Sequence, residues 1–434
     1  MENFTTENFA TENFATENFA TENFATENFV TENFVTENIR CDKNNKNSTM
    51  EHGTCRVIER GFIRTNGRYI EEVGEMSDLR PTTKEEDVKE DVLDAGGAWV
   101  LPGIIESHCH IGISEEKIGL IGDDCNEGTT PVTPALRAID AVNPMDAAFH
   151  DAIKAGITSV MAGPGSANVV GGQFVFMKTH GRCVDDMIVK YPAAMKTAFG
   201  ENPKTCYGDK DEYPATRMGV AALLRKTLFE AKQYKSKKEA GTLEEEDFEM
   251  EPWISVLNKE IPLKAHAHRA DDILTAIRIA KEFDLRMTID HGTESHLIAE
   301  WVKQSGFPVI VGPDLTSRSK LEVKNMNFKT NRLLYEHDIL FSITTDHPVT
   351  MIQYLPLCAG LAVKGGLPME EGLKAITINP ARICGVVDKV GSLKAGKHAD
   401  IAIFSGNPME VFTKTLYTII DGEIVYDYEK DEDD

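Results

Sequence analysis

The residues of this sequence that could do chemistry are histidines at the ends of apolar segments. His108 and His110 follow the apolar segment Trp99–Ile105. Residues two apart on a strand point the same way, so both imidazoles would face one side and Cys109 the other. Two imidazoles on one face are half of a zinc or similar divalent metal site. Alone the pair is weak evidence, because most such pairs lie on surfaces or in cores.

Further side chains of the same kind close three later apolar segments: His266 and His268, then His291, then Asp346. Each has an ordinary alternative, for example His291 as a hydrogen-bonded turn histidine and Asp346 as a helix cap. Together, five of the 12 histidines and one aspartate fall at the ends of four predicted strands. Unrelated residues would scatter between both strand ends and helix faces. The joint pattern therefore predicts a metal site.

The elements that must position these residues alternate along the chain. Short apolar segments and helical segments alternate from residue 100 to about residue 365, which is the size and rhythm of a (β/α)8 barrel. Strand-rich segments with Gly turns flank it on both sides. We therefore predict an α/β protein with a TIM-like (β/α)8 barrel over 99–384. A small β-sandwich would combine 53–98 with 385–428. Active sites of such barrels lie at the carboxyl ends of the strands.

The N-terminal segment has a different character. Residues 2–39 are a near-perfect five-residue repeat, mostly ENFAT or ENFVT. A period of five matches neither a strand nor a helix. A pentapeptide β-solenoid would need a small residue two before each Phe, where this sequence has Glu. We predict a disordered repeat tail and linker over 1–52, an acidic tail over 429–434, and a solvated charged insertion at Lys232–Glu251.

Composition excludes several classes of protein. The 434 residues carry a net charge of −24, which argues against binding to nucleic acid or an anionic membrane. The sequence contains no apolar stretch of about 18 or more residues, so we expect no membrane span. It begins without a basic region followed by an apolar segment, so we expect no ordinary secretory signal peptide. The 8 cysteines have no CxxC and no regular spacing, so we expect no disulfide framework. A cytoplasmic protein is the expectation.

Five stretches of this sequence carry a resemblance to a known family: DAGGAWVLPGIIESHCHIG, HAHRADDI, IDHGTE, TTDHP, and TINPARICGVVDKVGSLKAGKHADIAIFSGNP. The sequence resembles the amidohydrolase superfamily over about residues 55–428, and most closely its imidazolonepropionase-related and prolidase-like branch. The first four stretches resemble the signatures of strands one, five, six and eight of that barrel. The last resembles the segment that completes its small β-sandwich.

The resemblance implies a set of metal ligands on these strands: His108, His110, His266, His291 and Asp346. In the family, the strand-eight aspartate binds metal and also acts as general base. The resemblance thus implies a catalytic Asp346, with the metal or a histidine such as His291 polarising the scissile carbonyl. Zinc is the default, with Mn²⁺, Fe²⁺ or Co²⁺ as alternatives, at one or two ions per chain.

The strand-four position decides between one metal and two. Binuclear members carry a carboxylated lysine or a glutamate there, and this sequence offers Lys196 and Glu201. We expect Glu201, which stands at the apparent strand end. His268 should face the same way as His266 and is expected to contact substrate, with a supporting contact to a metal ligand as the alternative. Arg269 could hold a substrate carboxylate by its paired donors, with a helix-start salt bridge as the alternative.

The chemistry that follows is hydrolysis of a C–N bond in a small molecule: an amide, a cyclic amide or an Xaa-Pro-type peptide. A divalent metal lowers the pKa of bound water from about 15.7 to about 7, giving hydroxide, and Asp346 can move its proton to a leaving nitrogen. A deaminase is disfavoured, because Arg269 stands where related deaminases carry a glutamate. A catalytically silent scaffold is the alternative of a different class. A homo-oligomer is usual for chains that resemble this family.

Overall fold

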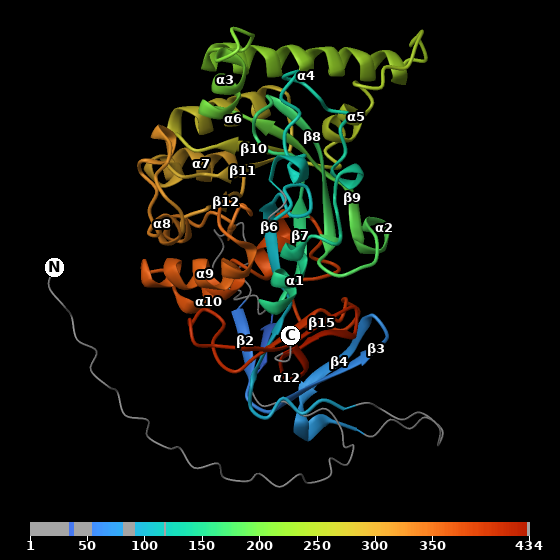
Figure 1. Ribbon diagram of the computed structural model, residues 1–434, viewed down its shortest axis with the longest axis vertical. Helices are drawn as coiled ribbons and strands as arrows, with labels where there is room; N and C mark the ends of the chain where they lie inside the picture. The colour runs from blue at the N-terminus through green and yellow to red at the C-terminus, as the bar shows by residue number, and fades with distance from the viewer. Residues whose placement is uncertain (1–33, 39–53, 81–91, 117–118, 432–434) are drawn as a thin grey trace, which may run out of the picture.

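The computed structural model describes residues 34–38, 54–80, 92–116 and 119–431. Its centre is an eight-stranded sheet, and two smaller sheets lie at one end of the molecule (Figure 1). The central strands follow one another in chain order: β6 (Ile104–Cys109), β7 (Ile157–Ala162), β8 (Val170–Lys178), β9 (Ile188–Ala198), β10 (Leu263–Ala267), β11 (Met287–His291), β12 (Val309–Val311) and β13 (Phe341–Ile343). Every residue of β6, β7, β8, β10 and β11 is buried, as expected of strands covered on both faces.

Hydrogen bonds between its two end strands curl the central sheet into a near-barrel. The hydroxyls of Ser107 and Ser342 lie 2.8 Å apart, and the Thr344 hydroxyl donates to the His108 carbonyl oxygen at 2.6 Å. The backbone N–H of His110 donates to the carbonyl oxygen of His347. The predicted TIM-like barrel is therefore confirmed.

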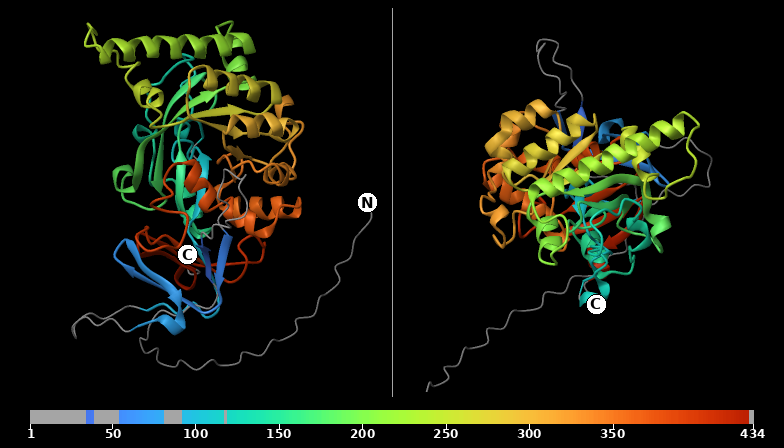
Figure 2. Two further views of the ribbon diagram at one scale, coloured as in Figure 1. Left: turned by 180° about the vertical axis from the view of Figure 1, so that it is seen from behind. Right: turned by 90° about the horizontal axis from the view of Figure 1, so that it is seen from above.

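Helices cover the outside of the near-barrel, and the long helix α4 crosses the end farthest from the small sheets (Figures 1 and 2). In α6, apolar residues such as Ile273, Ala276 and Ile277 recur at helical spacing and are buried. The helices are α1 (Ala147–Lys154), α2 (Val184–Met187), α3 (Glu201–Gly208), α4 (Arg217–Glu239), α5 (Pro252–Leu257), α6 (Ala270–Glu282), α7 (Ala299–Ser305), α8 (Thr330–Glu336), α9 (Leu355–Lys364), α10 (Met369–Lys374), α11 (Ile378–Ile383) and α12 (Tyr428–Asp431).

One strand departs from the predicted alternation of strands and helices. β8 runs antiparallel to both β7 and β9, while the other neighbours in the central sheet pair in parallel. Only the Gly-rich segment 163–169 joins β7 to β8, which is too short for a crossover helix, so the chain turns straight back. Part of the Gly-rich stretch is thus strand.

Both ends of the chain build the small sheets. The order of the six-stranded sheet is β16 (Glu423–Asp427), β15 (Thr415–Ile420), β14 (Ile401–Phe404), β5 (Trp99–Pro102), β1 (Phe34–Asn38) and β2 (Thr54–Ile58). β3 (Gly61–Asn66) and β4 (Tyr69–Glu75) form a hairpin beside it. The blue and red parts of the chain accordingly lie together in Figure 1. This union of the two flanking segments is as predicted.

Two boundaries differ from the sequence prediction. β5, expected in the barrel, pairs with β14 in the six-stranded sheet, so the first barrel strand begins only at Ile104. Residues 34–38, expected in the disordered tail, form strand β1, which pairs antiparallel with β2. The remaining tail residues, 1–33 and 39–52, and the last three residues lie outside the described part of the chain. The predicted insertion consists of the end of α4 and a mostly exposed loop.

Candidate metal centre

The predicted site residues lie at the carboxyl ends of four strands of the central sheet. His108 stands in β6, His266 in β10, and His291 at the end of β11. His110 and Asp346 follow β6 and β13. Because these four strands run in the same direction, their ends meet at one edge of the near-barrel. The structure thus brings together residues that are up to 238 positions apart in the sequence (346 − 108).

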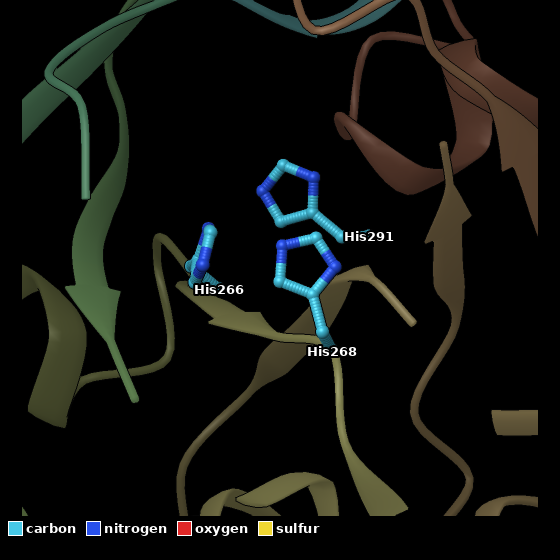
Figure 3. A group of neighbouring side chains, drawn as sticks. All are labelled: His266, His268 and His291. Atoms are coloured by element: carbon cyan, nitrogen blue, oxygen red, sulfur yellow. The ribbon is translucent and has the colours of Figure 1, made fainter. Parts of the chain in front are cut away.

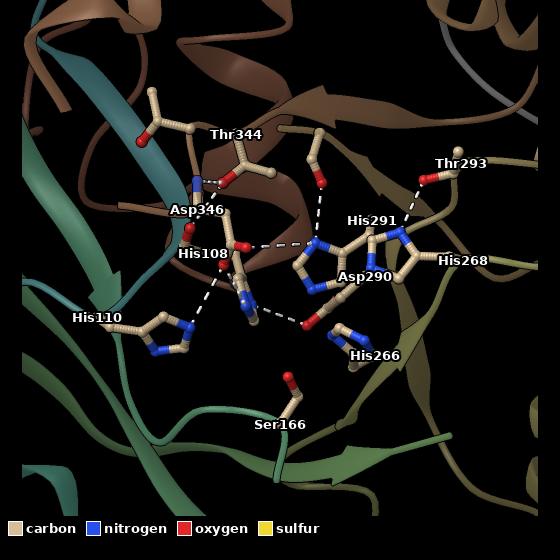
Figure 4. A network of polar contacts seen from close by, with 12 residues as sticks. His108, His110, Ser166, His266, His268, Asp290, His291, Thr293, Thr344 and Asp346 are labelled. Carbon is tan, nitrogen blue, oxygen red and sulfur yellow. Dashed lines mark hydrogen bonds and ion pairs between the residues drawn. The ribbon is translucent and has the colours of Figure 1, made fainter. Parts of the chain in front are cut away.

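The first cluster is called the aspartate group and consists of His108, His110 and Asp346. Oδ1 of Asp346 lies 3.4 Å from Nε2 of His108 and 3.3 Å from Nε2 of His110 (Figure 4). All three residues are buried. A carboxylate and two imidazoles this close together could hold a divalent metal ion.

The second cluster is called the histidine group and consists of His266, His268 and His291 (Figure 3). The rings of His266 and His291 have centroids 4.3 Å apart, and His268 stacks on His291 at 4.8 Å. The two groups adjoin, since Asp346 Oδ2 lies 3.8 Å from Nδ1 of His291. The structure therefore adds His268, predicted as a substrate contact, to a set of three candidate ligands.

Two buried ring atoms in the histidine group test whether a metal fits. Nδ1 of His266 and Nε2 of His291 are buried and have no hydrogen-bond partner among the described residues. Leaving a buried polar atom unpaired costs about 1–3 kcal/mol, so such atoms call for a partner. Imidazole nitrogens are donors that Zn²⁺ and similar divalent ions accept. The residues present fit a divalent metal.

Backbone carbonyls set the orientation of two imidazoles. Nδ1 of His110 lies 2.7 Å from the Gly163 carbonyl oxygen, and Nδ1 of His291 lies 2.8 Å from that of Gly312. A carbonyl oxygen only accepts, so in each ring Nδ1 carries the proton and donates. At His291 this leaves Nε2 with a lone pair directed into the site, which is how second partners usually fix a metal-binding histidine. At His110 the same contact directs Nε2 at the Asp346 carboxylate.

The backbone is strained at two of the candidate ligands. His291 has φ +71° and Asp346 has φ +53°, in the left-handed region that non-glycine residues rarely adopt. Such conformations cost about 1–3 kcal/mol and cluster at functional sites. At His291 the turn breaks the alternation of the strand. Asp290 and His291 can then both face the site, although they are consecutive (Figure 4).

Burial governs the protonation of most of the histidines. Desolvation is the main cause that lowers the pKa well below its usual value in three of them: His108, His266 and His291. Burial also lowers the pKa of His268 to about 4. Each of these rings is therefore neutral at pH 7 and has a lone pair to offer.

The pKa values of His110 and Asp346 shift in the opposite sense to what burial alone would produce. Burial alone would lower the pKa of His110, but the neighbouring Cys125 and the Asp346 carboxylate raise it to about 10. Burial alone would raise the pKa of Asp346, but interactions with the imidazoles of His291 and His110 hold it below its usual value. Asp346 is accordingly ionised at neutral pH.

On strand four the structure brings Lys196 to the site, and not the expected Glu201. Lys196 is fully buried in β9 with its Nζ 3.3 Å from Nε2 of His108, and burial lowers its pKa to about 8. The strand ends at Ala198, and Gly200, at φ +82°, turns the chain so that Glu201 begins α3. Glu201 belongs to neither ligand group.

Arg269 does not reach the ligand groups either. Its guanidinium makes two 2.9 Å hydrogen bonds to the Asp271 carboxylate at the start of α6, and its side chain is 35% exposed. This is the helix-start salt bridge given above as the alternative. The expected role in holding a substrate carboxylate has no support in this geometry, because the paired donors are occupied.

Several polar residues at the site had no specific role assigned from the sequence. Asn202 Nδ2 lies 3.4 Å from Nε2 of His266, Lys320 Nζ donates to Asn202 Oδ1 at 2.7 Å, and buried Glu322 lies 3.8 Å from Nε2 of His268. Asn202 stands in the first turn of α3, and Lys320 and Glu322 lie at a short 3-10 turn, Leu321–Val323, where the sequence gives little signal. Asp290 did give a signal in the sequence, because it is a carboxylate within a predicted strand.

Buried histidines and a carboxylate at the mouth of a near-barrel define a class of metal-dependent barrel proteins. The sequence model that describes the Amidohydrolase family matches residues 99–425 of this chain. The chain therefore belongs to the amidohydrolase family, as the sequence motifs predicted.

Individual relatives agree with this assignment. The crystal structure of an amidohydrolase from Thermotoga maritima MSB8 is 41% identical, covers 84% of this chain and 94% of its own, and has a TM-score of 0.80. Amidohydrolase tasK of Hapsidospora irregularis is 28% identical over 375 residues, which are 79% of this chain and 38% of tasK. Imidazolonepropionase of Pseudomonas syringae pv. tomato is 23% identical, covering 82% of this chain and 90% of that enzyme. The chain thus spans well under half of the length of tasK.

The membrane question has a brief answer. Among the helices of the described ranges, none combines the length and the apolar character that a bilayer crossing requires.

Proposed function

We propose that this amidohydrolase hydrolyses a C–N bond of a small molecule, in an amide, a cyclic amide or an Xaa-Pro-type peptide, with Asp346 as the residue that moves the proton. The observation that carries the proposal is the position of the Asp346 carboxylate. One oxygen faces the imidazoles of His108 and His110, and the other faces His291 in the second group. Family membership supports the reaction class.

The aspartate group and the histidine group are the residues that would hold divalent metal. Zinc is the first candidate, and Mn²⁺, Fe²⁺ or Co²⁺ are alternatives, since nitrogen and oxygen donors suit all of them. A bound divalent ion supplies a Lewis acid for the scissile carbonyl and lowers the pKa of water to about 7. Two ions per chain are the expectation, and Lys196, rather than Glu201, is the strand-four residue that would hold them, once carboxylated on Nζ. Nζ of Lys196 adjoins His108 Nε2.

Asp346 is suited to both halves of a general base and acid cycle. Its lowered pKa keeps the carboxylate ionised at neutral pH, so a carboxylate oxygen can accept a proton from the attacking water. The same oxygen can return that proton to the leaving nitrogen.

His291 is better suited to ligation than to direct polarisation of the substrate. With its Nδ1 proton donated to Gly312, the neutral ring has only a lone pair at Nε2 and no proton to offer a carbonyl oxygen. We therefore assign Nε2 of His291 to metal, and leave polarisation of the carbonyl to the ion.

The alternatives predict different results in one assay. A silent scaffold would not need two complete ligand groups, and a deaminase would release ammonia. The test is a screen of N-acyl amino acids, Xaa-Pro dipeptides and cyclic ureides with zinc- or manganese-loaded full-length chain, beside Asp346→Asn. Ring opening or release of a substituted amine that the variant lacks would support the proposal. Ammonia release alone, or no turnover of any compound by the loaded protein, would overturn it. Homo-oligomer formation and a cytoplasmic location stay predictions.

A further inference from the structure

Directly beneath the aspartate group lies a buried polar layer that the reaction above does not use. Lys264 in β10 and Asp290 in β11 are both at most 1% exposed, and Lys264 Nζ lies 3.2 Å from Asp290 Oδ2. Lys264 Nζ also donates to the Ser107 carbonyl oxygen at 3.2 Å. Phe174 packs against this layer, with the centre of its ring 5.3 Å from Lys264 Nζ. We refer to Lys264, Asp290 and their partners as the floor of the site.

The floor is connected to the metal-binding groups through one histidine. Asp290 Oδ2 lies 2.9 Å from Nδ1 of His108, and both side chains are completely buried (Figure 4). The other oxygen of Asp290 accepts a 2.7 Å hydrogen bond from the Thr288 hydroxyl. Thr288 and Lys264 therefore fix the Asp290 carboxylate beside Nδ1 of His108.

This contact determines which nitrogen of His108 faces the metal position. The adjacent carboxylate favours the tautomer with the proton on Nδ1, a nitrogen that has no other partner among the described residues. Nε2 then has its lone pair directed at the region shared by His110 and Asp346, which lies 3.4 Å away. A carboxylate behind a ligating histidine also raises the basicity of the ligand.

We propose that Asp290 is a positioning residue of the aspartate group, and that Lys264 is its buried counter-charge. Asp290 would act through His108 and touch neither metal nor substrate. The inference rests on the proposed metal-dependent function and adds to it the residues that orient the first ligand. It also accounts for a lysine and an aspartate in the interior of the barrel, where two unpaired charges would be strongly unfavourable.

The test removes the pair as a unit, so that no lone charge stays buried. The double variant Asp290→Asn with Lys264→Met is compared with wild type by titrating metal-free, full-length chain with Co²⁺ and recording its visible absorption. Asp346→Asn identifies the signal of the aspartate group. We expect about 10- to 100-fold weaker binding at the aspartate group, with an altered spectrum, and unchanged binding at the histidine group.

A matched control separates positioning from general destabilisation. Lys178 and Asp400 form another buried lysine–aspartate ion pair, at the opposite end of the near-barrel, where Lys178 pairs with Ser159 near the start of β7. Lys178→Met with Asp400→Asn should leave both Co²⁺ affinities unchanged. Equal Co²⁺ affinity and spectrum in the floor variant and wild type would overturn the inference, as would an equal loss in the control. A wild-type chain that binds no Co²⁺ would instead overturn the proposed function itself.

Discussion

The aspartate group and the histidine group lie side by side, but they differ in charge and in the residues that orient their ligands. The aspartate group contains an ionised carboxylate and is backed by the charged residues Lys196, Lys264 and Asp290. The histidine group contains three neutral rings and is backed by a backbone carbonyl and the Thr293 hydroxyl. Glu322, which lies 3.8 Å from Nε2 of His268, is bound to Lys320 and to the Glu201 N–H.

The difference indicates that the two groups have different chemical roles. A group with a carboxylate attracts a cation by charge and can also exchange a proton, whereas three neutral imidazoles bind a cation only through lone pairs. The groups also arise differently in the fold. The first joins β6 to β13, where the sheet closes, and the second lies on the neighbouring strands β10 and β11. Proton transfer is therefore assigned to the closing edge of the barrel.

The largest expected effect comes from removing the charge of the aspartate group. Asp346→Asn should lower kcat/KM by about 10²- to 10⁴-fold, because it removes the only proton carrier assigned to the reaction. The histidine group should keep its metal. Steady-state kinetics and metal analysis on one preparation measure both quantities. Activity within threefold of wild type would show that Asp346 does not move the proton.

The next effect concerns the histidine group. His268→Ala should weaken one of two metal affinities by more than about 100-fold, since a lost ligand should exceed the loss of an outer partner. The aspartate group should be unaffected. Arg269→Ala is the matched control, since its guanidinium is paired with Asp271 and should change neither affinity. Two intact affinities in His268→Ala would return His268 to the role of substrate contact.

The pH dependence of metal affinity should also distinguish the aspartate group from the histidine group, with a smaller effect. The pKa of His110 is raised to about 10 in the metal-free chain, chiefly by Cys125 and Asp346 acting against burial. Below that pH a metal must displace a proton, so affinity at the aspartate group should rise about tenfold per unit between pH 6.5 and 8.5. The rings of the histidine group have lowered pKa values and are already neutral there. Chelator competition at three pH values should give one steep and one flat profile, and two parallel profiles would contradict this.

The smallest effect tests the support of the histidine group. Nδ1 of His268 lies 2.8 Å from the Thr293 hydroxyl, which fixes the orientation of the ring. Thr293→Val keeps the shape and removes that partner, and should weaken metal binding there by about tenfold. Isothermal titration with Zn²⁺ gives the affinity. A loss confined to the aspartate group would mean that the two groups are not separately supported.

Much of this arrangement could be predicted from the sequence. The ligand histidines end buried apolar strands, and parallel strands bring their ends to one edge, so clustering follows from topology. The antiparallel β8 could not be predicted, because a Gly-rich stretch fits a loop as well as the start of a strand. The choice of Lys196 over Glu201 depended on where β9 ends. Strand boundaries are the least certain feature of a sequence-based prediction.

The contacts of charged side chains could not be predicted from the sequence either. Whether Arg269 faces a substrate or its neighbour Asp271 is a matter of rotamer, and both conformations suit the start of a helix. The floor pair is made by residues 26 positions apart (290 − 264), and only the pairing of β10 with β11 makes them neighbours. Sequence types show that such residues carry charge, but not which partner each one takes.

The central claim is that these two groups hold divalent metal, and metal content tests it most directly. Full-length chain purified without chelator, and Asp346→Asn beside it, would be analysed by plasma mass spectrometry. We predict close to two equivalents of zinc or another divalent metal in wild type, and a lower content in the variant. A wild-type chain without metal, which takes up none when Zn²⁺ or Mn²⁺ is added, would contradict the account.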